Sequence, residues 1–202
     1  MLYRETVTPE LLASLGHLMT LRVLSETRLV GGTALALQLG HRQSVDIDLF
    51  GNIRATGENL MASLSETGEI TTVQSDKAVR QYFINQIKVD IVNYQYDWIA
   101  PLITNAGIRM ADKSDIAAMK VSAITNRGSR KDFVDLYFLL EHYSLQDILD
   151  FYLRKYPDGN DWLAIRSLGY FDVAEQQPMP KMYVDVSWID IRRRIEDEVK
   201  RC

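Results

Sequence analysis

The sequence is poor in cysteine and in long apolar runs. Its one cysteine, Cys202, ends the chain, so a disulfide within the chain is impossible and a cysteine-based metal site is not expected. No apolar stretch approaches the roughly 20 residues that a membrane-spanning helix needs. The opening residues, Met1-Leu2-Tyr3-Arg4-Glu5, lack the apolar segment of a signal peptide. We therefore expect a cytoplasmic protein with no membrane partner.

The chain also lacks an excess of basic residues. Lys and Arg number 23 against 27 Asp and Glu, which gives a net charge of −4. This balance gives no global basic footprint, so any contact with nucleic acid must come from a local patch. Internal repeats and low-complexity tracts are absent as well. With 202 residues, 47% of them hydrophobic, the chain is expected to form one domain, or a core with an appendage.

Two aspartates alternate with apolar residues in the segment VDIDLF, residues 45–50. In a β-strand, Val45, Ile47 and Leu49 would face a core, and Asp46 and Asp48 would share the other face. Two like charges side by side repel each other. A divalent cation offsets such repulsion, and Mg²⁺ is typically held by one or two carboxylates plus substrate phosphates. The alternative is an edge strand with a solvated acidic face.

A glycine pair lies upstream of these aspartates. Residues 28–30 predict a short strand, Gly31-Gly32-Thr33 a turn, and the run ALALQLG a helix. Glycine lets the backbone approach a ligand, and the first N–H groups of a helix point toward an anion. The Thr33 hydroxyl can add a further donor. The pattern therefore predicts a phosphate cradle; the alternative is a plain tight turn in which Thr33 caps the helix.

A third acid, Asp90, lies midway along the apolar segment IKVDIVNY, residues 87–94. Asp90 is opposite in phase to Val89 and Ile91, and an acid within an apolar strand costs stability unless it has a partner. The alternative is an exposed acid at a sheet edge. Elsewhere the patterns predict helices from Pro9 and over 56–66, 112–126 and 130–143, strands over 69–74 and 80–85, a connector over 98–110, and a last helix after Ser187.

The segment from Gly31 to Phe50, GGTALALQLGHRQSVDIDLF, resembles the polymerase-β-type nucleotidyltransferase superfamily, whose signature is G-[GS], a helix and D-x-[DE]. It is closer still to the abortive-infection (AbiE-type) nucleotidyltransferase toxin family, which carries an H-R-x-S-x-D-[IL]-D element, here His41 to Asp48. The later segments MK-x₆-RGSRKDFVDLYFLL and YFDVAEQQPMP extend this resemblance over most of the chain.

The resemblance implies roles for residues in both halves of the chain. Asp46, Asp48 and Asp90 would bind two Mg²⁺ ions, with Mn²⁺ as an alternative, and Asp90 would act as metal ligand or as general base. The backbone at Gly31, Gly32 and Thr33 would hold the triphosphate.

Further roles fall in the predicted helical half. Lys120 would contact the nucleoside triphosphate, and Lys131, Asp132 and Asp135 would lie near the phosphates or the acceptor, with Asp135 among the catalytic residues. For Asp132 the alternative is a first-turn acid facing the helix dipole. Arg42 could reach a phosphate, and its alternative is a cation at a helix C-terminus.

The resemblance predicts an α/β fold with a mixed sheet in a nucleotidyltransferase core, residues 1–110. A helical region, residues 111–202, would complete the active site. The expected activity is Mg²⁺-dependent transfer of a nucleoside monophosphate from a nucleoside triphosphate to a hydroxyl, with tRNA or another RNA as acceptor. The chain would act as the toxin of a toxin–antitoxin pair in phage defence, with a cognate antitoxin as partner. The alternatives are a nucleotide- or metal-binding module without turnover, and a kinase that uses the same acids.

Overall fold

The computed structural model describes residues 2–202, which form two units of the chain. The sheet unit contains the described residues up to Gly40, together with Ser44–Gln95 and Leu102–Ala111. The helical unit contains His41–Gln43, Tyr96–Pro101 and Asp112–Cys202. The chain therefore passes more than once between the two units.

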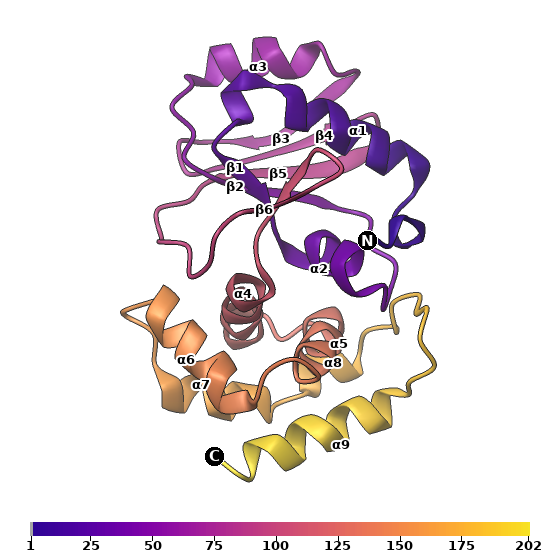
Figure 1. The fold of residues 1–202 in the computed structure, drawn as a ribbon, viewed down its shortest axis with the longest axis vertical. Helices are drawn as coiled ribbons and strands as arrows, with labels where there is room; N and C mark the ends of the chain where they lie inside the picture. Colours follow the sequence, from indigo (N-terminus) through magenta and orange to yellow (C-terminus); the bar gives the residue numbers. More distant parts are fainter. Residues whose placement is uncertain (1) are drawn as a thin grey trace. The chain divides into compact units, whose positions relative to one another are not determined.

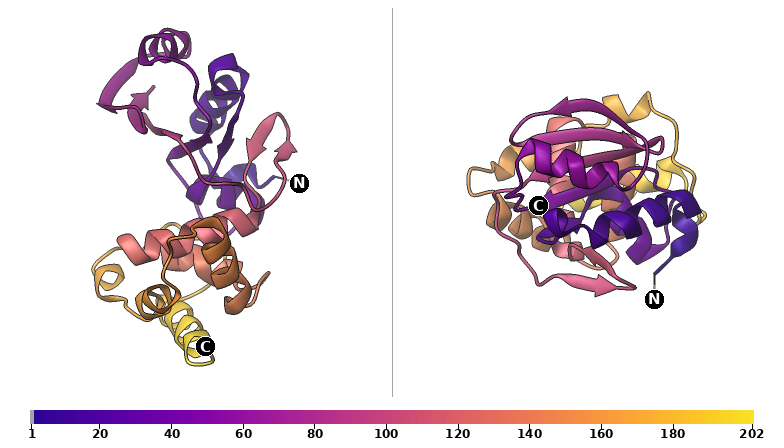
Figure 2. Two further views of the ribbon diagram at one scale, coloured as in Figure 1. Left: turned by 90° about the vertical axis from the view of Figure 1, so that its left-hand side faces the viewer. Right: turned by 90° about the horizontal axis from the view of Figure 1, so that it is seen from above.

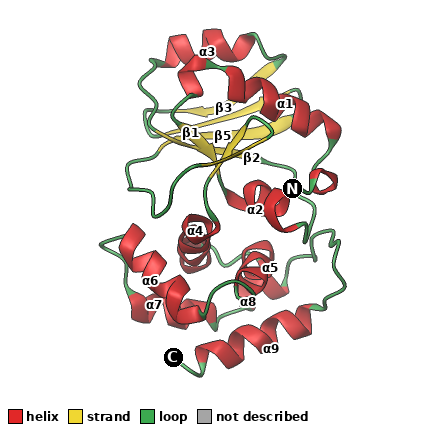
Figure 3. Ribbon diagram, in the orientation of Figure 1, coloured by secondary structure: helices red, strands yellow, loops and turns green. Residues whose placement is uncertain are grey.

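The sheet unit is built from seven strands with helices on both faces (Figures 1 and 3). Its helices are η1 (Arg4–Thr6), α1 (Pro9–Thr20), η2 (Arg22–Leu24), α2 (Gly31–Leu39) and α3 (Gly57–Ser65). Its strands are β1 (Thr27–Leu29), β2 (Ile47–Gly51), β3 (Ile70–Ser75), β4 (Val79–Ile84), β5 (Ile87–Asn93), β6 (Ile103–Asn105) and β7 (Ile108–Met110). Helices α1 and α3 lie on one side of the sheet, and α2 lies on the other (Figure 1).

The strand order is β3-β4-β5-β2-β1-β7-β6, and the sheet is mixed. β2 pairs antiparallel with β1 and parallel with β5. The register of the parallel pair sets Ile47 beside Val89 and Asp48 beside Asp90. Ile47 and Val89 are fully buried, so the apolar alternation of both strands points one face into the core. The same alternation places the two aspartates together on the opposite face.

The helical unit contains α4 (Lys113–Asn126), α5 (Arg130–Leu139), α6 (Leu145–Lys155), α7 (Asp161–Leu168), α8 (Asp172–Glu175) and α9 (Trp188–Val199). Side-chain caps start most of the longer helices. Asp112 accepts from the Ser114 N–H, Ser144 and Asp147 form a capping box, and Ser187 accepts from the Asp190 N–H. No helix in residues 2–202 is long and apolar enough to cross a membrane.

The connector expected over residues 98–110 contains a small hairpin, β6–β7, that the sequence patterns do not reveal (Figure 2). Its strands have three residues each, which is too short for a period-2 signal. The turn consists of Ala106 and Gly107, both with positive φ, as a type I′ hairpin turn requires. Alanine rarely adopts a positive φ, so only Gly107 indicates a turn in the sequence and Ala106 does not. The helix expected over 130–143 also ends earlier, at Leu139.

A fully buried ion pair stabilises the helical unit. Lys155 Nζ lies 2.7 Å from Asp115 Oδ1, and both side chains are 0% exposed. Asp115 also accepts the N–H groups of Ile99 and Ala100, and Lys155 Nζ lies 4.5 Å from the centre of the Trp98 ring. The pair therefore fixes residues 96–101 onto helices α4 and α6.

Replacing Lys155 with Met should destabilise the protein by roughly 3–5 kcal/mol, because Asp115 would keep a buried charge without its cation. Urea unfolding followed by circular dichroism measures the change. Adding Asp115→Asn to this variant should restore part of the loss, since it removes the unpaired charge. Lys200→Met is the matched control, because Lys200 forms only an exposed pair. Equal stabilities of Lys155→Met and the control would contradict the assignment.

Candidate active site

Three carboxylates gather near the start of β2 and the middle of β5. Asp48 and Asp90 occupy neighbouring positions on these parallel strands, and Asp46 precedes Asp48 by two residues. All three are partly buried. The strand expected over 45–50 begins at Ile47, and the expectation that Val45 faces the core is wrong, since it is 59% exposed. The reason is that the β2–β5 pairing starts only at Ile47.

The glycine turn lies directly against this carboxylate group. Gly31 begins α2 with φ +67°, and a Cβ at this position would collide with Asp48 Oδ2. Only glycine satisfies both the backbone conformation and the close approach. The residue before the helix, Val30, provides no side-chain cap for α2. The start of α2 at Gly31 therefore lies next to Asp48 and receives no cap from the side chain of its N-cap residue.

Thr33 has a structural role different from both sequence interpretations of its hydroxyl. Its side chain is buried, its Oγ1 donates to the carbonyl of Asp46, and it lies 2.8 Å from Ser44 Oγ. The helix cap is Val30, so Thr33 is not the N-cap residue. The Thr33 hydroxyl holds the chain just before β2, which fixes where Asp46 lies. The backbone N–H of Thr33, and not its hydroxyl, is therefore the group for which a phosphate contact stays a prediction.

A lysine not singled out from the sequence lies among the three acids. Lys88 Nζ is 2.8 Å from Asp90 Oδ2, which also accepts from Gln81 at 3.3 Å. Burial alone would lower the pKa of Lys88. The hydrogen bond and charge of Asp90, followed by the charges of Asp46 and Asp48, outweigh it and raise this pKa. The signal was present in the sequence, because Lys88 and Asp90 are two residues apart on one strand face.

The carboxylates fit a divalent cation in their chemistry, although no group of three His, Cys, Asp or Glu side chains in the described chain is arranged as a ligand set. Lys88 occupies one oxygen of Asp90. The other oxygen, Oδ1, is buried without a hydrogen-bond partner among residues 2–202. A buried polar atom without a partner costs free energy, so a ligand for Oδ1 would be favourable. Asp46 and Asp48 supply the two carboxylates that a Mg²⁺ site commonly uses.

The helical unit contains a buried ion network centred on Asp135 (α5). Arg42 donates from Nε and Nη2 to the two Asp135 oxygens at 2.7 and 2.8 Å, and His41 Nε2 donates to Oδ1 at 2.8 Å. Lys120 Nζ (α4) lies 2.6 Å from Asp135 Oδ2 and 2.9 Å from Asp132 Oδ1. Asp135 is 0% exposed. Arg42 is thus a bidentate partner of a carboxylate rather than a cation at a helix end.

The second acid of the network, Asp132, connects it to the surface. Arg127 donates two hydrogen bonds to Asp132, yet its own side chain is 60% exposed. Three cations, Arg42, Lys120 and Arg127, face two carboxylates, so the network carries a formal charge of +1 when His41 is neutral. Lys131, next in sequence to Asp132, is exposed. The nucleotide-binding roles implied for these residues stay predictions.

Charge sets the protonation states of this network. Burial alone would raise the pKa of Asp135, but the Arg42 charge, followed by that of Lys120, holds it well below its ordinary value. Burial has the same effect on Asp132, and the charges and hydrogen bonds of Lys120 and Arg127 lower its pKa strongly. For Lys120, the charges of Asp135 and Asp132 overcome burial and raise the pKa. All three groups are therefore charged at neutral pH.

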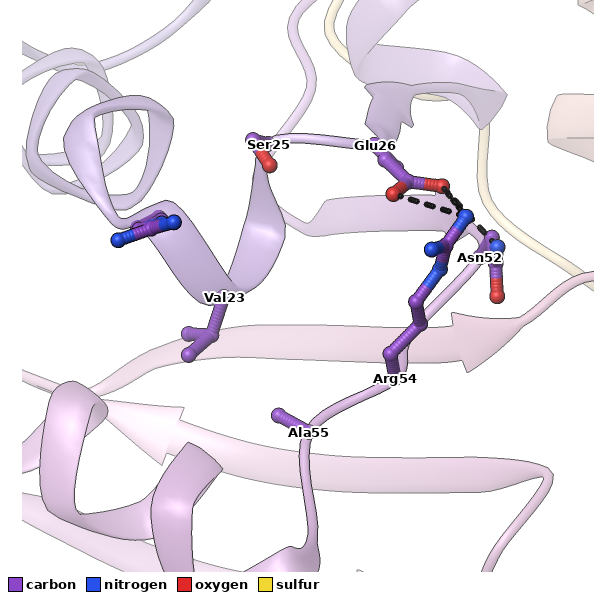
Figure 4. A pocket seen from close by; sticks show the side chains of 7 residues that line it. Val23, Ser25, Glu26, Asn52, Arg54 and Ala55 are labelled. Carbon is purple, nitrogen blue, oxygen red and sulfur yellow. Dashed lines mark hydrogen bonds and ion pairs between the residues drawn. The ribbon is translucent and has the colours of Figure 1, made fainter.

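A pocket of about 550 Å³ lies elsewhere in the sheet unit, beside Glu26 before β1 and Asn52 after β2 (Figure 4). Glu26 accepts from Asn52 at 3.0 Å and from Arg54 at 3.4 Å. Because β1 and β2 are antiparallel, with Thr27 opposite Gly51, this pocket lies at the end of the strands away from Asp46 and Asp48. Pocket size therefore does not identify the site, and the carboxylate chemistry does.

Replacing Asp135 with Asn should destabilise the protein by roughly 3–5 kcal/mol at pH 7, because Arg42 and Lys120 would keep buried charges. Because the pKa of Asp135 is lowered in the folded protein, its charge stabilises the fold at pH values above the ordinary pKa of 3.8. This stabilisation is lost as the pH falls toward the folded-state pKa. The difference between wild type and variant should therefore shrink below about pH 4. Urea unfolding at pH 7, 5 and 3.5 measures it, with Asp185→Asn, at an exposed position outside the helices, as the control. A difference independent of pH would contradict the charge assignment.

Comparisons with known proteins identify the family to which the chain belongs. The family model described as nucleotidyl transferase AbiEii toxin, type IV TA system, matches residues 22–199. A protein from Aquifex aeolicus strain VF5, named only as uncharacterized protein aq_aa25, is 29% identical over 199 residues, which cover 93% of each chain.

Solved structures share the fold. MenT4, a nucleotidyltransferase toxin from Mycobacterium tuberculosis H37Rv, is similar with a TM-score of 0.60 at 15% identity, covering 94% of this chain and 82% of MenT4. JHP933 from Helicobacter pylori is similar with a TM-score of 0.54 at 18% identity, covering 95% of this chain and 90% of JHP933. The expected α/β nucleotidyltransferase fold with a mixed sheet is thereby confirmed. Since the family model spans most of the sequence, this chain belongs to the AbiEii family of nucleotidyltransferase toxins of type IV toxin–antitoxin systems.

Proposed function

We propose that the enzyme moves a nucleoside monophosphate from a nucleoside triphosphate to a hydroxyl of an RNA acceptor, with tRNA as the first candidate, in a Mg²⁺-dependent reaction. One observation carries the proposal. Asp48 and Asp90 lie side by side on parallel strands, and the Gly31 turn that starts a helix lies against Asp48. A helix N-terminus attracts phosphate, and carboxylates attract the cation that accompanies it.

In this proposal, each group of residues in the sheet unit has its own role. The N–H groups at Gly31, Gly32 and Thr33 would bind phosphate oxygens of the substrate. Asp46 and Asp48 would hold Mg²⁺, or Mn²⁺, which when bound supplies positive charge to the attacking and leaving oxygens. Asp90 has an oxygen, Oδ1, without a hydrogen-bond partner in the described part of the chain, so it can take a ligand or accept the proton of the acceptor hydroxyl.

The reaction that follows is an in-line displacement. The acceptor oxygen forms a bond to the α-phosphorus, the bond between that phosphorus and the bridging oxygen breaks, and pyrophosphate leaves with the electron pair. Positioning and charge supply most of the acceleration in such transfers. For Lys120 we still predict a contact with the nucleoside triphosphate, and for Asp135 a place among the catalytic residues, as the family resemblance implies. Family membership supports an antitoxin partner, and we extend the role to phage defence.

Replacing Asp48 with Asn should reduce nucleotidyl transfer at least about a hundredfold, because a neutral amide cannot offset the charge of a cation as a carboxylate does. The assay incubates protein, Mg²⁺, each α-³²P nucleoside triphosphate and total tRNA, and follows label on the RNA. Asp46→Asn should behave alike. Glu10→Gln, an exposed acid in the first turn of α1, is the control.

The outcomes of this assay separate the alternatives. Full activity of folded Asp48→Asn protein would overturn the mechanism. Label on a protein or small molecule in place of RNA would keep the chemistry and remove the RNA acceptor. Transfer of a γ-label with no transfer of an α-label would identify a kinase.

Replacing Lys88 with Met should tighten Mn²⁺ binding in the absence of nucleotide by about tenfold. Removing one positive charge a few ångströms from three carboxylates is worth more than about 1 kcal/mol at the effective dielectric constant near a protein surface. Electron paramagnetic resonance titration of free Mn²⁺ measures the affinity. Lys88→Arg should keep the wild-type value, and Lys77→Met, at an exposed position, serves as control. Weaker binding by Lys88→Met would show that Lys88 holds Asp90 in place for the metal.

A further inference from the structure

A small pocket lies in the helical unit where α4 ends. Its volume is about 160 Å³, and its lining combines apolar, hydroxyl, amide, aromatic and guanidinium groups. The lining residues are Ile124, Thr125, Asn126, Arg127, Gly128, Ser167, Tyr170 and Val173. An engineered apolar cavity of about 150 Å³ holds one benzene ring. The pocket therefore has the size of a single planar ring system, and its rim is polar.

Two planar side chains in this lining are fixed at their far ends by carboxylates. Arg127 donates from Nε and Nη2 to Asp132, at 2.9 and 3.1 Å. The hydroxyl of Tyr170 is hydrogen-bonded to Asp172, which raises the pKa of Tyr170. Yet the Arg127 side chain is 60% exposed and Tyr170 is 57% exposed. The Tyr170 ring and the Arg127 guanidinium are thus held in place by hydrogen bonds while much of their surface is exposed. A ligand that stacks on them therefore loses little binding free energy to the ordering of these side chains.

The same contacts argue against a phosphate in this pocket. Much of the hydrogen-bonding edge of Arg127 is engaged by the buried carboxylate of Asp132. The carboxylate of Asp172 lies at the Tyr170 hydroxyl and repels anions. What the pocket offers is a ring face, a guanidinium plane, the apolar side chains of Ile124 and Val173, and the Asn126 amide at an exposed position. Flat heterocycles with polar edges match these groups best.

We infer that this pocket binds one nucleobase, stacked on Tyr170 and on the guanidinium plane of Arg127. Unpaired RNA bases are recognised by stacking on aromatic rings and arginine planes, with hydrogen bonds to their edges. The base comes either from the incoming nucleotide or from an unpaired position of the RNA acceptor. The inference rests on the proposed nucleotidyl transfer to RNA, since that reaction brings nucleobases to the protein.

The test compares Tyr170→Ala with Tyr170→Phe, in which the ring remains and only the hydroxyl is lost. Binding is measured with two probes: fluorescein-labelled single-stranded RNA octamers of A, C, G or U by anisotropy, and each nucleoside triphosphate with Mg²⁺ by calorimetry. Tyr170→Ala should weaken one of these affinities about tenfold, the usual effect of losing one base stack. Tyr170→Phe should stay within about twofold of wild type. Trp162→Ala, which removes another exposed aromatic side chain of this unit, is the matched control.

The result decides the source of the base. A loss confined to RNA assigns the pocket to the acceptor, and a loss confined to one nucleoside triphosphate assigns it to the nucleotide. Unchanged affinities for both probes in folded Tyr170→Ala protein, or an equal loss in Trp162→Ala, would overturn the inference. Because the readout is binding, it remains separate from transfer. If the unmodified protein transfers no label from any nucleoside triphosphate, but Tyr170→Ala still weakens binding, the pocket would stand and the proposed chemistry would be refuted.

Discussion

The repulsion among the carboxylates near the start of β2 and the middle of β5 is the constraint on which the site depends. Parallel pairing sets Asp48 beside Asp90, and Asp46 lies just before β2, two residues from Asp48. Lys88 offsets part of this charge from within the sheet. The arrangement leaves a net negative cluster beside a helix start that favours anions. The carboxylates attract a cation, and the start of helix α2 attracts a phosphate. Because cation and phosphate carry opposite charges, the binding of one favours the binding of the other.

The sequence predicted this part of the fold well because its signals are local. Asp46, Asp48 and the glycine turn lie within one short segment, and Asp90 stands out against an apolar strand. Lys88 is not singled out by any motif, although its spacing from Asp90 places it on the same strand face. The network around Asp135 could not be read from periodicity, since Arg42 and Asp135 are far apart in the sequence. Long-range ion pairing depends on tertiary packing, which no local pattern encodes.

Burial also explains why the helical residues resisted interpretation. Lys120, which the family resemblance places against the nucleoside triphosphate, is buried and has its ion-pair partners on α5. A buried lysine bound to two aspartates fits a structural role as well as a substrate-binding one, because breaking such a pair costs stability either way. Family membership establishes the enzyme class.

The division of the chain has a consequence for dissecting the protein. His41–Gln43 and Tyr96–Pro101 belong to the helical unit although they lie in the first half of the sequence. A fragment that begins after Ala111 would lack Arg42, so Asp135 would lose its bidentate partner. It would also lack the backbone N–H groups of Ile99 and Ala100 that Asp115 binds. The two units are thus interleaved along the chain, and no single cut separates one from the other.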